Sequence, residues 1–533
     1  MSICTHPHSP KIAPPATIPR SPPLRNNWWI DPFNTRSGSP TLLATVIANP
    51  KTRIAQINPE HYSHFIEHLG DCVYDGIWVG PSTPVDHTDG IRQFTIDALR
   101  DVGPAVMRWP GGCFADQYHW RDGIGDPESR PATQNIFWGG IEPNRFGTHE
   151  FVGFCQKIRA TPYICGNVGT GSPQEMMDWL EYCNGNDDST LVEERRANDA
   201  LEPMNIKYWG VGNESWGCGG HMQPHEYAAL FRNYHTYLSR MDANVQFVAV
   251  GHDATWNRDL LRALQRGTAV PNLQALSIHR YFSRDRKAFV YDEAEHLDLV
   301  AEAHLLEQDI AQADGTLKNY EDPAHPIGLI IDEWGVWDKE KATPEHGLRQ
   351  PNCLREAIIA ASCLDIFTAR ADRVTMTNIA QTVNVLQCLI ETRGPEAWVT
   401  PTYHVYDLYQ DHIGHDAIAT HVSSPTLDVL DFRQSPVHQL SAAASLSSDG
   451  TRATFSVTNR HFSETLGCSL NIHDGNMGDV EGRLLTGTDA RAENSPANPT
   501  CVTPIPLDVE TSDNTVRLDL PPLSVAVVTA SVS

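Results

Sequence analysis

Eight strand-like runs, most of them separated by stretches of helical length, constrain the fold of this chain more than any other feature of its sequence. The runs cover residues 64–69, 105–110, 161–168, 206–212, 246–251, 275–281, 327–332 and 373–380. Apolar strands that alternate with helices are typical of a parallel (β/α)₈ barrel, in which both faces of each strand are buried. A doubly wound sheet normally contains fewer strands and a glycine-rich phosphate turn. The sequence has neither a GxGxxG motif nor a P-loop.

The pattern changes near residue 400, where helical periodicity gives way to short alternating runs between polar turns. Runs such as ATFSVTN, VRLDL and SVAVVTASVS predict an antiparallel β-sandwich of jelly-roll type. We therefore expect an α/β protein with a (β/α)₈ TIM barrel at residues 58–400 and a C-terminal sandwich at residues 401–533. The run LLATVIA, within residues 41–57, is predicted to pair with the sandwich. The proline-rich residues 1–40 are predicted to form a disordered leader.

The composition limits the partners that this chain can have. With 66 acidic and 40 basic residues, the formal net charge is −26, which argues against nucleic acid or an anionic membrane as a partner. No apolar run is long enough for a transmembrane helix. Residues 1–27 lack the continuous apolar stretch of a signal peptide. The sequence therefore predicts a cytoplasmic protein, with export by a non-standard route as the alternative.

The 12 cysteines form no CxxC pair and no dense disulfide framework. Several stand inside apolar runs, where cysteine behaves as a small buried hydrophobic residue. This distribution predicts a reducing compartment.

Two of the predicted strands end at a glutamate. The segment IKYWGVGNESWG contains Glu214, and the segment IGLIIDEWGVW contains Glu333. The C-terminal ends of barrel strands form the mouth where active sites lie, and paired carboxylates perform glycoside hydrolysis. Glu214, flanked by Trp209 and Trp216, is the candidate general acid, and Glu333 is the candidate nucleophile. The two-residue period of a strand predicts that Asp332 points to the face opposite Glu333.

The segment His64-Phe65-Ile66-Glu67-His68 matches the HxxEH pattern of one class of zinc peptidases. Zinc chemistry of this type requires the motif on a helix, whereas this segment follows a proline turn and falls in the first predicted strand. We therefore expect no metal site, and we interpret Glu67 as a carboxylate that binds ligand hydroxyl groups.

Three further strand ends carry polar residues. The second strand ends in Arg108 and a glycine turn that reaches Cys113. The sixth ends in Tyr281, which can hydrogen-bond the nucleophile, although a lone histidine or tyrosine at a strand end, here His279 or Tyr281, is more often explained by packing. The eighth is followed by Gln381, which offers an amide to a neutral polar ligand. The sequence has no GxSxG motif, which argues against a serine hydrolase.

Segments between residues 55 and 410 resemble, in chain order, the blocks of glycoside hydrolase family 51, the α-L-arabinofuranosidases. They are HFIEHLGDCVYDGIW, MRWPGGCFADQYHWRDGIG, YWGVGNE, SIHRYF, IDEWGVW and AQTVNV. In the clan to which this family belongs, the acid/base residue lies on strand four and the nucleophile on strand seven. These are the positions of Glu214 and Glu333 in the predicted strand order.

The resemblance implies roles for individual residues. Glu214 resembles the acid/base residue and Glu333 the nucleophile. The positions that resemble contacts to the arabinose ring or the nucleophile are Glu67, Cys113, Asn213, Tyr281 and Gln381. Family members use no cofactor and commonly form homo-oligomers. The sequence departs from the family at Cys113, where many relatives have asparagine, at Gly335, and in the SWGCGGHM loop after Glu214.

The sequence therefore predicts a retaining, exo-acting α-L-arabinofuranosidase that acts on arabinan, arabinoxylan or their oligosaccharides. An endo-acting glucanase or xylanase of the same clan is the nearest alternative. A carbohydrate-binding protein with an inactive site and a metallopeptidase are alternatives from other functional classes.

Overall fold

The eight predicted barrel strands are present in the computed structural model, and they close into one parallel barrel in chain order. They are β2 (Ser63–Phe65), β5 (Val106–Trp109), β8 (Thr161–Gly166), β9 (Tyr208–Val211), β10 (Gln246–Val250), β11 (Ala275–Phe282), β12 (Gly328–Val336) and β13 (Val374–Ala380). The structure describes residues 42–267, 273–282, 292–431, 434–512 and 514–533. The leader predicted for residues 1–40 lies outside these ranges.

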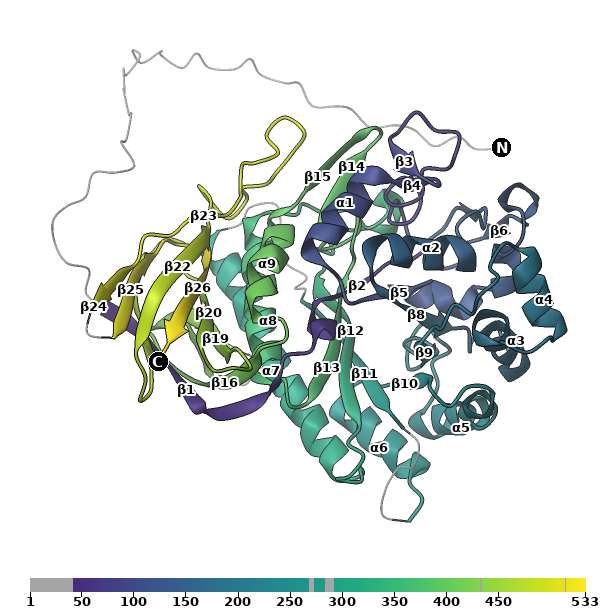
Figure 1. Ribbon diagram of the computed structural model, residues 1–533, viewed down its shortest axis with the longest axis horizontal. Coiled ribbons are helices and arrows are strands. Elements are labelled where there is room, and N and C mark those ends of the chain that lie inside the picture. Colours follow the sequence, from purple (N-terminus) through teal and green to yellow (C-terminus); the bar gives the residue numbers. More distant parts are fainter. Residues whose placement is uncertain (1–41, 268–272, 283–291, 432–433, 513) are drawn as a thin grey trace, which may run out of the picture. The chain divides into compact units, whose positions relative to one another are not determined.

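A helix follows each barrel strand and covers the outside of the barrel (Figure 1). These helices are α1 (Gln93–Val102), α2 (Thr148–Ile158), α3 (Pro173–Asn184), α5 (Pro224–Met241), α6 (Ala254–Leu264), α7 (Glu293–Lys318), α8 (Leu354–Ala369) and α9 (Pro401–Tyr409), with α4 (Thr190–Ala197) inserted after α3. Helix α7 has an N-cap of its own, because the Asp292 side chain accepts a hydrogen bond from Glu295 N in its first turn. Among the described helices, none is both long and apolar enough to cross a membrane.

Strand β12 carries a β-bulge, that is, one extra residue between two paired positions, relative to both neighbouring strands. Ser277 and His279 of β11 pair with Ile330 and Glu333 of β12, so an extra residue lies between them, and the same irregularity is present against β13. Such a β-bulge re-aims the side chains around it. Asp332 and Glu333 therefore both reach the barrel interior, where both contact the His279 ring. The prediction that Asp332 points to the opposite face is wrong, because two-residue alternation does not hold across a bulge.

The C-terminal domain is a single ten-stranded sheet that folds over onto itself. The strands, in spatial order, are β23 (Ile505–Pro506), β22 (Met477–Leu485), β26 (Ser524–Val532), β20 (Arg452–Asn459), β19 (Leu440–Leu446), β16 (Asp416–Ser423), β1 (Leu42–Gln56), β21 (Leu466–Ile472), β25 (Thr515–Leu520) and β24 (Glu510–Ser512). Strand β25 also contacts β22 and β26, which are not its neighbours in this order. The enclosed core includes Val46, Phe455 and Leu470. Strand β1 pairs antiparallel with β16 and parallel with β21.

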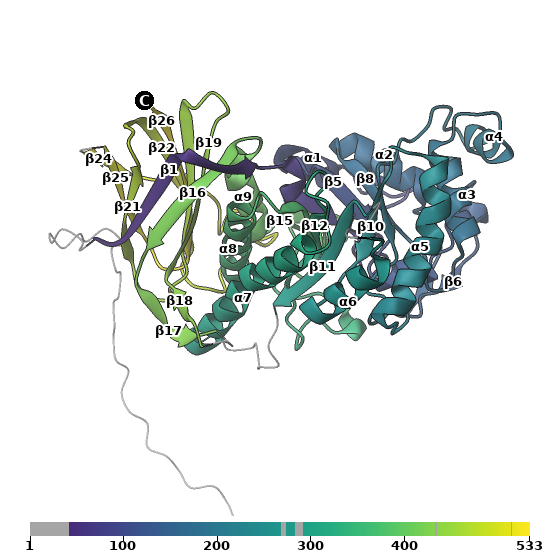
Figure 2. The same cartoon turned by 90° about the horizontal axis from the view of Figure 1, so that it is seen from below.

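Helices α8 and α9 lie between the barrel strands and this sheet (Figures 1 and 2), and a buried carboxyl group stands where α8 contacts it. Asp365 of α8 accepts hydrogen bonds from Ser456 Oγ at 2.5 Å, Ser441 Oγ at 2.7 Å and Tyr409 Oη at 2.7 Å. Burial outweighs these three donors and raises the pKa of Asp365 to about 6. The contact between the two domains is therefore sensitive to pH.

Replacement of Asp365 by asparagine tests this sensitivity. The folded protein holds the Asp365 proton more tightly than the unfolded chain, so the wild type loses stability from this group as pH rises from about 4 to about 6. We expect the difference in unfolding free energy, Asp365→Asn minus wild type, to rise by about 2 kcal/mol from about pH 4.5 to about pH 7.5. Thermal unfolding at both pH values measures this change. The exposed Asp508→Asn is the control, and an equal pH dependence in both variants would contradict the prediction.

Candidate active site

Six of the eight barrel strands contribute side chains to one polar cluster at their C-terminal ends. They are Glu67 after β2, Arg108 on β5, Asn213 and Glu214 after β9, His279 and Tyr281 on β11, Asp332 and Glu333 on β12, and Gln381 after β13. Of the predicted site residues, all but Cys113 belong to this cluster, and Cys113 lies beside it.

The guanidinium of Arg108 lies at the centre of the cluster, with its side chain only 1% exposed. Its Nη1 donates to Glu333 Oε1 at 2.9 Å, and its Nη2 donates to Asn213 Oδ1 at 2.7 Å. Its Nε lies 3.4 Å from Asp332 Oδ2. Burial opposes ionisation of Asp332, but the charges of Arg108 and His279 lower the pKa of that carboxyl to about 2. Arg108 thus joins strands β5, β9 and β12 through charged hydrogen bonds.

The imidazole of His279 bridges three carboxylates. Its Nδ1 lies 2.9 Å from Glu214 Oε1 and 3.5 Å from Glu333 Oε2, and its Nε2 lies 3.1 Å from Asp332 Oδ1. Burial lowers the pKa of His279, but the carboxylates of Glu333, Asp332 and Glu214 more than offset this effect and raise it to about 10. The ring is therefore an imidazolium ion at neutral pH. A carboxylate oxygen of Glu214 lies within 4.8 Å of one of Glu333 beside this ring.

The phenol of Tyr281 completes the surroundings of Glu333. Its hydroxyl donates to Glu333 Oε2 at 2.8 Å, while Arg108 donates to Oε1. Both oxygens of Glu333 therefore accept a hydrogen bond, which fixes the orientation of this side chain.

Glu67, which follows β2, adds a further carboxyl group to the cluster at the mouth of the barrel. Its Oε1 accepts from Phe114 N at 3.0 Å and from Trp138 Nε1 at 2.9 Å, and its Oε2 accepts from Gln381 Nε2 at 3.1 Å. Burial and the charge of Glu333 raise the pKa of Glu67 to about 7. This carboxyl group can therefore act as either a donor or an acceptor near neutral pH.

The HxxEH segment does not form a zinc site of the peptidase type. His64 lies on strand β2, not on a helix, and its ring packs against Tyr406 at 5.1 Å between centroids. The Nδ1 of His68 lies 2.8 Å from Glu142 Oε2. Each histidine of the motif is therefore engaged away from Glu67.

Cys113 is bonded to Cys218 in a disulfide that joins the turn after β5 to the loop after β9. This pairing was not predicted, because the two cysteines are 105 residues apart and neither belongs to a recognisable cysteine pattern. The nine other cysteines in the described residues are free, and all of them except Cys501 are buried.

The two tryptophans that flank Glu214 in the sequence have different surroundings. Trp216 donates from Nε1 to Gly251 O at 3.1 Å, and its ring stacks on His252 with centroids 3.8 Å apart. Trp209 is fully buried and packs edge-on against Trp179 of α3. Trp216 is thus the tryptophan that remains partly exposed at the mouth of the barrel.

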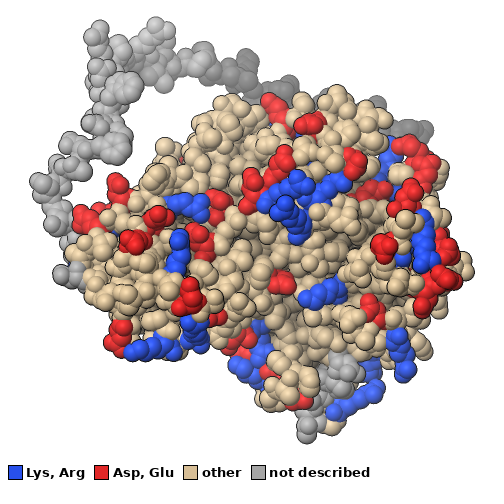
Figure 3. Space-filling view, in the orientation of Figure 1, with Lys and Arg blue, Asp and Glu red and all other residues tan. Residues whose placement is uncertain are grey.

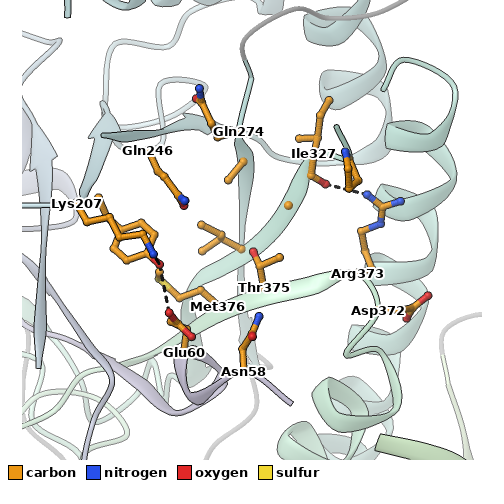
Figure 4. A pocket seen from close by; sticks show the side chains of 15 residues that line it. Asn58, Glu60, Lys207, Gln246, Gln274, Ile327, Asp372, Arg373, Thr375 and Met376 are labelled. Atoms are coloured by element: carbon orange, nitrogen blue, oxygen red, sulfur yellow. Dashed lines mark hydrogen bonds between the residues drawn. The ribbon is translucent and has the colours of Figure 1, made fainter. Parts of the chain in front are cut away.

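A cavity of about 360 Å³ lies at the opposite, N-terminal end of the barrel strands (Figure 4). Lys207 Nζ donates to Tyr208 Oη at 2.8 Å, and Tyr208 Oη donates to Glu60 Oε1 at 3.3 Å. Arg373 donates from Nη1 to Ile327 O at 2.8 Å. Arg373 is also paired with Glu321 at 2.8 Å and Asp314 at 2.6 Å, so it already has acidic partners, and active sites of such barrels lie at the other end. The cavity is therefore not the candidate site.

Acidic and basic side chains are interspersed over the described part of the face in Figure 3. The net charge of −26 is thus not concentrated there in a single region. This arrangement is typical of a soluble protein surface rather than of a charged docking face.

Sequence reasoning underestimated three residues of the cluster: Arg108, His279 and Asp332. Arg108 interrupts the otherwise apolar run VMRW, and a buried guanidinium requires acidic or carbonyl partners. That interruption was a signal for a charged network inside the barrel. The position of Asp332 depends on the bulge in β12, for which the sequence carries no comparable signal.

Comparisons with known proteins agree on one family. The signature of the "Alpha-L-arabinofuranosidase 1 domain" matches residues 98–298, and that of the "Alpha-L-arabinofuranosidase C-terminal domain" matches residues 332–524. A protein of Bacteroides ovatus named "Intracellular exo-alpha-L-arabinofuranosidase" is 37% identical over 480 residues, which cover 88% of this chain and 92% of that protein.

Two solved structures are similar along almost the whole chain. The family 51 arabinofuranosidase of Xanthomonas axonopodis pv. citri is 34% identical with a TM-score of 0.87, and it covers 92% of this chain and 100% of its own. The α-L-arabinofuranosidase of Thermotoga maritima, solved as an arabinose complex, is 31% identical with a TM-score of 0.81 and the same coverage. These similarities favour an arabinofuranosidase over an endo-acting glucanase or xylanase of the same clan.

The protonation of His279 can be measured directly. We expect two slowly exchanging imidazole N–H resonances that are absent from His279→Gln and that persist at about pH 8.5, because three carboxylates hold the charged ring. Proton NMR spectra of the wild type and the variant measure this. The exposed His252→Gln is the control and should leave both resonances in place. Loss of both signals below about pH 8 would contradict the assignment of charge.

Proposed function

The chain belongs to glycoside hydrolase family 51 and is an α-L-arabinofuranosidase, and from this premise we propose that it is a retaining, exo-acting enzyme. It would release terminal arabinofuranose from arabinan, arabinoxylan or their oligosaccharides. The approach of the Glu214 and Glu333 carboxylates to within 4.8 Å carries this proposal. Carboxyl groups about 5–5.5 Å apart are typical of retaining enzymes, whereas inverting enzymes separate them by about 6.5–9.5 Å. Exo action is supported by the name of the Bacteroides ovatus relative.

In the first step, Glu333 attacks the anomeric carbon while Glu214 donates a proton to the oxygen of the leaving group. The glycosidic C–O bond breaks, and a glycosyl ester forms on Glu333. Arg108 and Tyr281 orient the two oxygens of Glu333 before the attack. The nucleophile therefore enters the reaction already positioned.

In the second step, Glu214 accepts a proton from a water molecule, and the oxygen of that water attacks the anomeric carbon. The bond to Glu333 breaks, so arabinose leaves with the configuration of the substrate. Glu214 is protonated again at the end of the cycle. His279 contacts both carboxylates and can compensate the charge that moves between them.

The arabinose ring would lie between Glu333 and the position of Glu67. Glu67 and Gln381 are hydrogen-bonded to each other and form one polar wall that can bind ring hydroxyl groups. The Oδ1 of Asn213 accepts a hydrogen bond from Arg108. This contact fixes the amide orientation, so the Nδ2 of Asn213 can donate to the sugar. Cys113, expected as a ligand contact, would contribute through the disulfide sulfur and not through a thiol.

We further propose that the enzyme works in the cytoplasm without a cofactor and forms a homo-oligomer. The cytoplasmic location is supported by the "intracellular" name of the Bacteroides ovatus relative. The Cys113–Cys218 disulfide argues against the reducing compartment that the cysteine distribution predicted, because disulfides are rare in the cytosol. The remaining two properties follow from the resemblance of this chain to its family.

Substitution of the two glutamates tests their roles. We expect Glu333→Gln to lower kcat by about 10⁴-fold or more, since no glycosyl ester can form. Glu214→Ala should lose about 10²–10⁴-fold on substrates with poor leaving groups. Azide should restore its turnover of an activated aryl arabinofuranoside by forming an arabinofuranosyl azide. Glu60→Gln, at the other end of the barrel, is the control. Full activity of either glutamate variant without azide would contradict the assignment of Glu333 as nucleophile and Glu214 as acid/base residue.

The products distinguish the proposed reaction from its alternatives. We expect arabino-oligosaccharides to yield monomeric arabinose, with the α-anomer detected first by proton NMR before mutarotation. A panel of aryl arabinofuranoside, xyloside and glucoside should show preference for the arabinofuranoside. Initial release of the β-anomer would overturn the retaining mechanism, and oligosaccharides from an unbranched glucan or xylan would support an endo-acting enzyme instead.

A further inference from the structure

Glu214 stands in a strained backbone conformation at the start of a glycine-rich loop. Its φ of 39° lies in the left-handed region, which is unfavourable for a residue with a side chain. Glu214 O accepts from both Gly217 N at 2.6 Å and Gly219 N at 3.1 Å, so the chain turns tightly behind it. We call residues 213–222 the acid/base loop. Glycine-rich segments lose much conformational freedom when they are ordered, so this loop needs anchors outside itself.

One anchor is the buried carboxylate of Asp116, which follows β5. Its Oδ1 accepts from Val168 N at 2.9 Å and Gly169 N at 3.0 Å, and its Oδ2 accepts from Asn213 N at 3.4 Å. A side chain at Gly219 would place its Cβ 2.7 Å from Asp116 Oδ2. The loop is therefore packed directly against Asp116, but the one hydrogen bond that it donates to this carboxylate, from Asn213 N, is long.

The second anchor is covalent. Cys218, in the middle of the acid/base loop, is bonded to Cys113 in the turn after β5. The Cys218 Sγ lies 3.6 Å from Glu214 Oε2. The turn at the other end of the bridge contacts Glu67, which accepts from Phe114 N at 3.0 Å. The disulfide thus connects the backbone around the proposed proton donor to the wall proposed to bind the sugar.

We infer that the Cys113–Cys218 disulfide positions Glu214 for proton transfer and that its reduction lowers catalysis of reactions that depend on this transfer. The inference rests on the proposed role of Glu214 as acid/base residue. A dithiol would reduce the bridge: the S–S bond breaks, two electrons and two protons convert the sulfurs into thiols, and the dithiol becomes a disulfide. Both cysteines are partly exposed, so a small dithiol can reach them.

Reduction has two consequences for Glu214. The acid/base loop loses its covalent connection to the turn after β5 and keeps only non-covalent contacts, namely those of Asn213 with Asp116 and Arg108 and those of Trp216 with Gly251 and His252. In addition, the Cys218 thiol becomes a hydrogen-bond donor beside Glu214 Oε2, where the disulfide sulfur has no hydrogen. Both changes act on the acid/base residue, whereas Glu333 is held by Arg108 and Tyr281 inside the barrel. Reduction therefore affects the nucleophile little.

Two substrates distinguish an effect of reduction on proton donation by Glu214 from an effect on attack by Glu333. An aryl arabinofuranoside with a nitrophenolate leaving group needs little protonation, while methyl α-L-arabinofuranoside needs a proton from Glu214. After treatment with dithiothreitol, we expect kcat/KM for the methyl glycoside to fall at least about tenfold and that for the nitrophenyl glycoside to fall less than about threefold. Thiol alkylation with mass spectrometry verifies the reduction of Cys113 and Cys218, and reoxidation should restore both activities.

Two variants serve as controls. The double variant Cys113→Ser/Cys218→Ser should resemble the reduced wild type and should not respond to dithiothreitol. Cys501→Ser removes the exposed free cysteine of the described residues and should keep the wild-type response. Circular dichroism of the reduced wild type verifies that the fold is retained, so the test does not depend on whether the double variant folds.

The outcomes are distinct. Selective loss on the methyl glycoside supports the inference. Equal loss on both substrates, no change after verified reduction, or free thiols at both positions in the oxidised protein would overturn it. An oxidised protein that hydrolyses neither arabinofuranoside would overturn the proposed function itself.

Discussion

The buried guanidinium of Arg108 is the interaction on which the rest of the site depends. A cation inside a barrel is costly unless acceptors surround it, and here Glu333, Asn213 and Asp332 provide them. These acceptors stand on or directly after two other strands, so the charge on β5 determines where β9 and β12 carry their polar residues. The proposed nucleophile, Glu333, is therefore positioned by the same interaction that makes the buried charge tolerable.

The bulge in β12 makes this arrangement possible with two adjacent carboxylates. Without the extra residue, Asp332 and Glu333 would point to opposite faces of the strand. With it, Asp332 contacts both Arg108 and His279. Its pKa of about 2 keeps this carboxyl group ionised, so it acts as their counterion. Arg108 and His279 contact both carboxylates, so Asp332 supplies a second negative charge that balances these two cations beside Glu333. A local irregularity of one strand thus places a structural carboxylate, Asp332, beside the proposed nucleophile, Glu333.

Sequence patterns predicted the barrel, its strand order and the strand-end positions of the two glutamates, because each strand carries a continuous apolar run of its own. They did not predict interactions that depend on the alignment of neighbouring strands. The bulge at Asp332 is a property of register, and apolar periodicity does not record an inserted residue. The Cys113–Cys218 pair was missed for a related reason: loops from two different strands meet only once the barrel has closed. His279 was interpreted as packing, since a single histidine has no pattern without its three carboxylate partners.

The two glutamates proposed as catalytic residues are supported in different ways, and this difference has a consequence for the evolution of the site. Glu333 lies inside a hydrogen-bonded strand, and two fixed donors orient it, so sequence changes in the loops leave it in place. Glu214 lies on a loop that holds it in an unfavourable backbone conformation through a disulfide and one buried aspartate. Protonation of the leaving group occurs on the loop side, where the remainder of the substrate must also bind. Variation in the acid/base loop can therefore alter which leaving groups are accepted without disturbing the attack on the anomeric carbon, because the barrel strands hold the nucleophile independently of that loop.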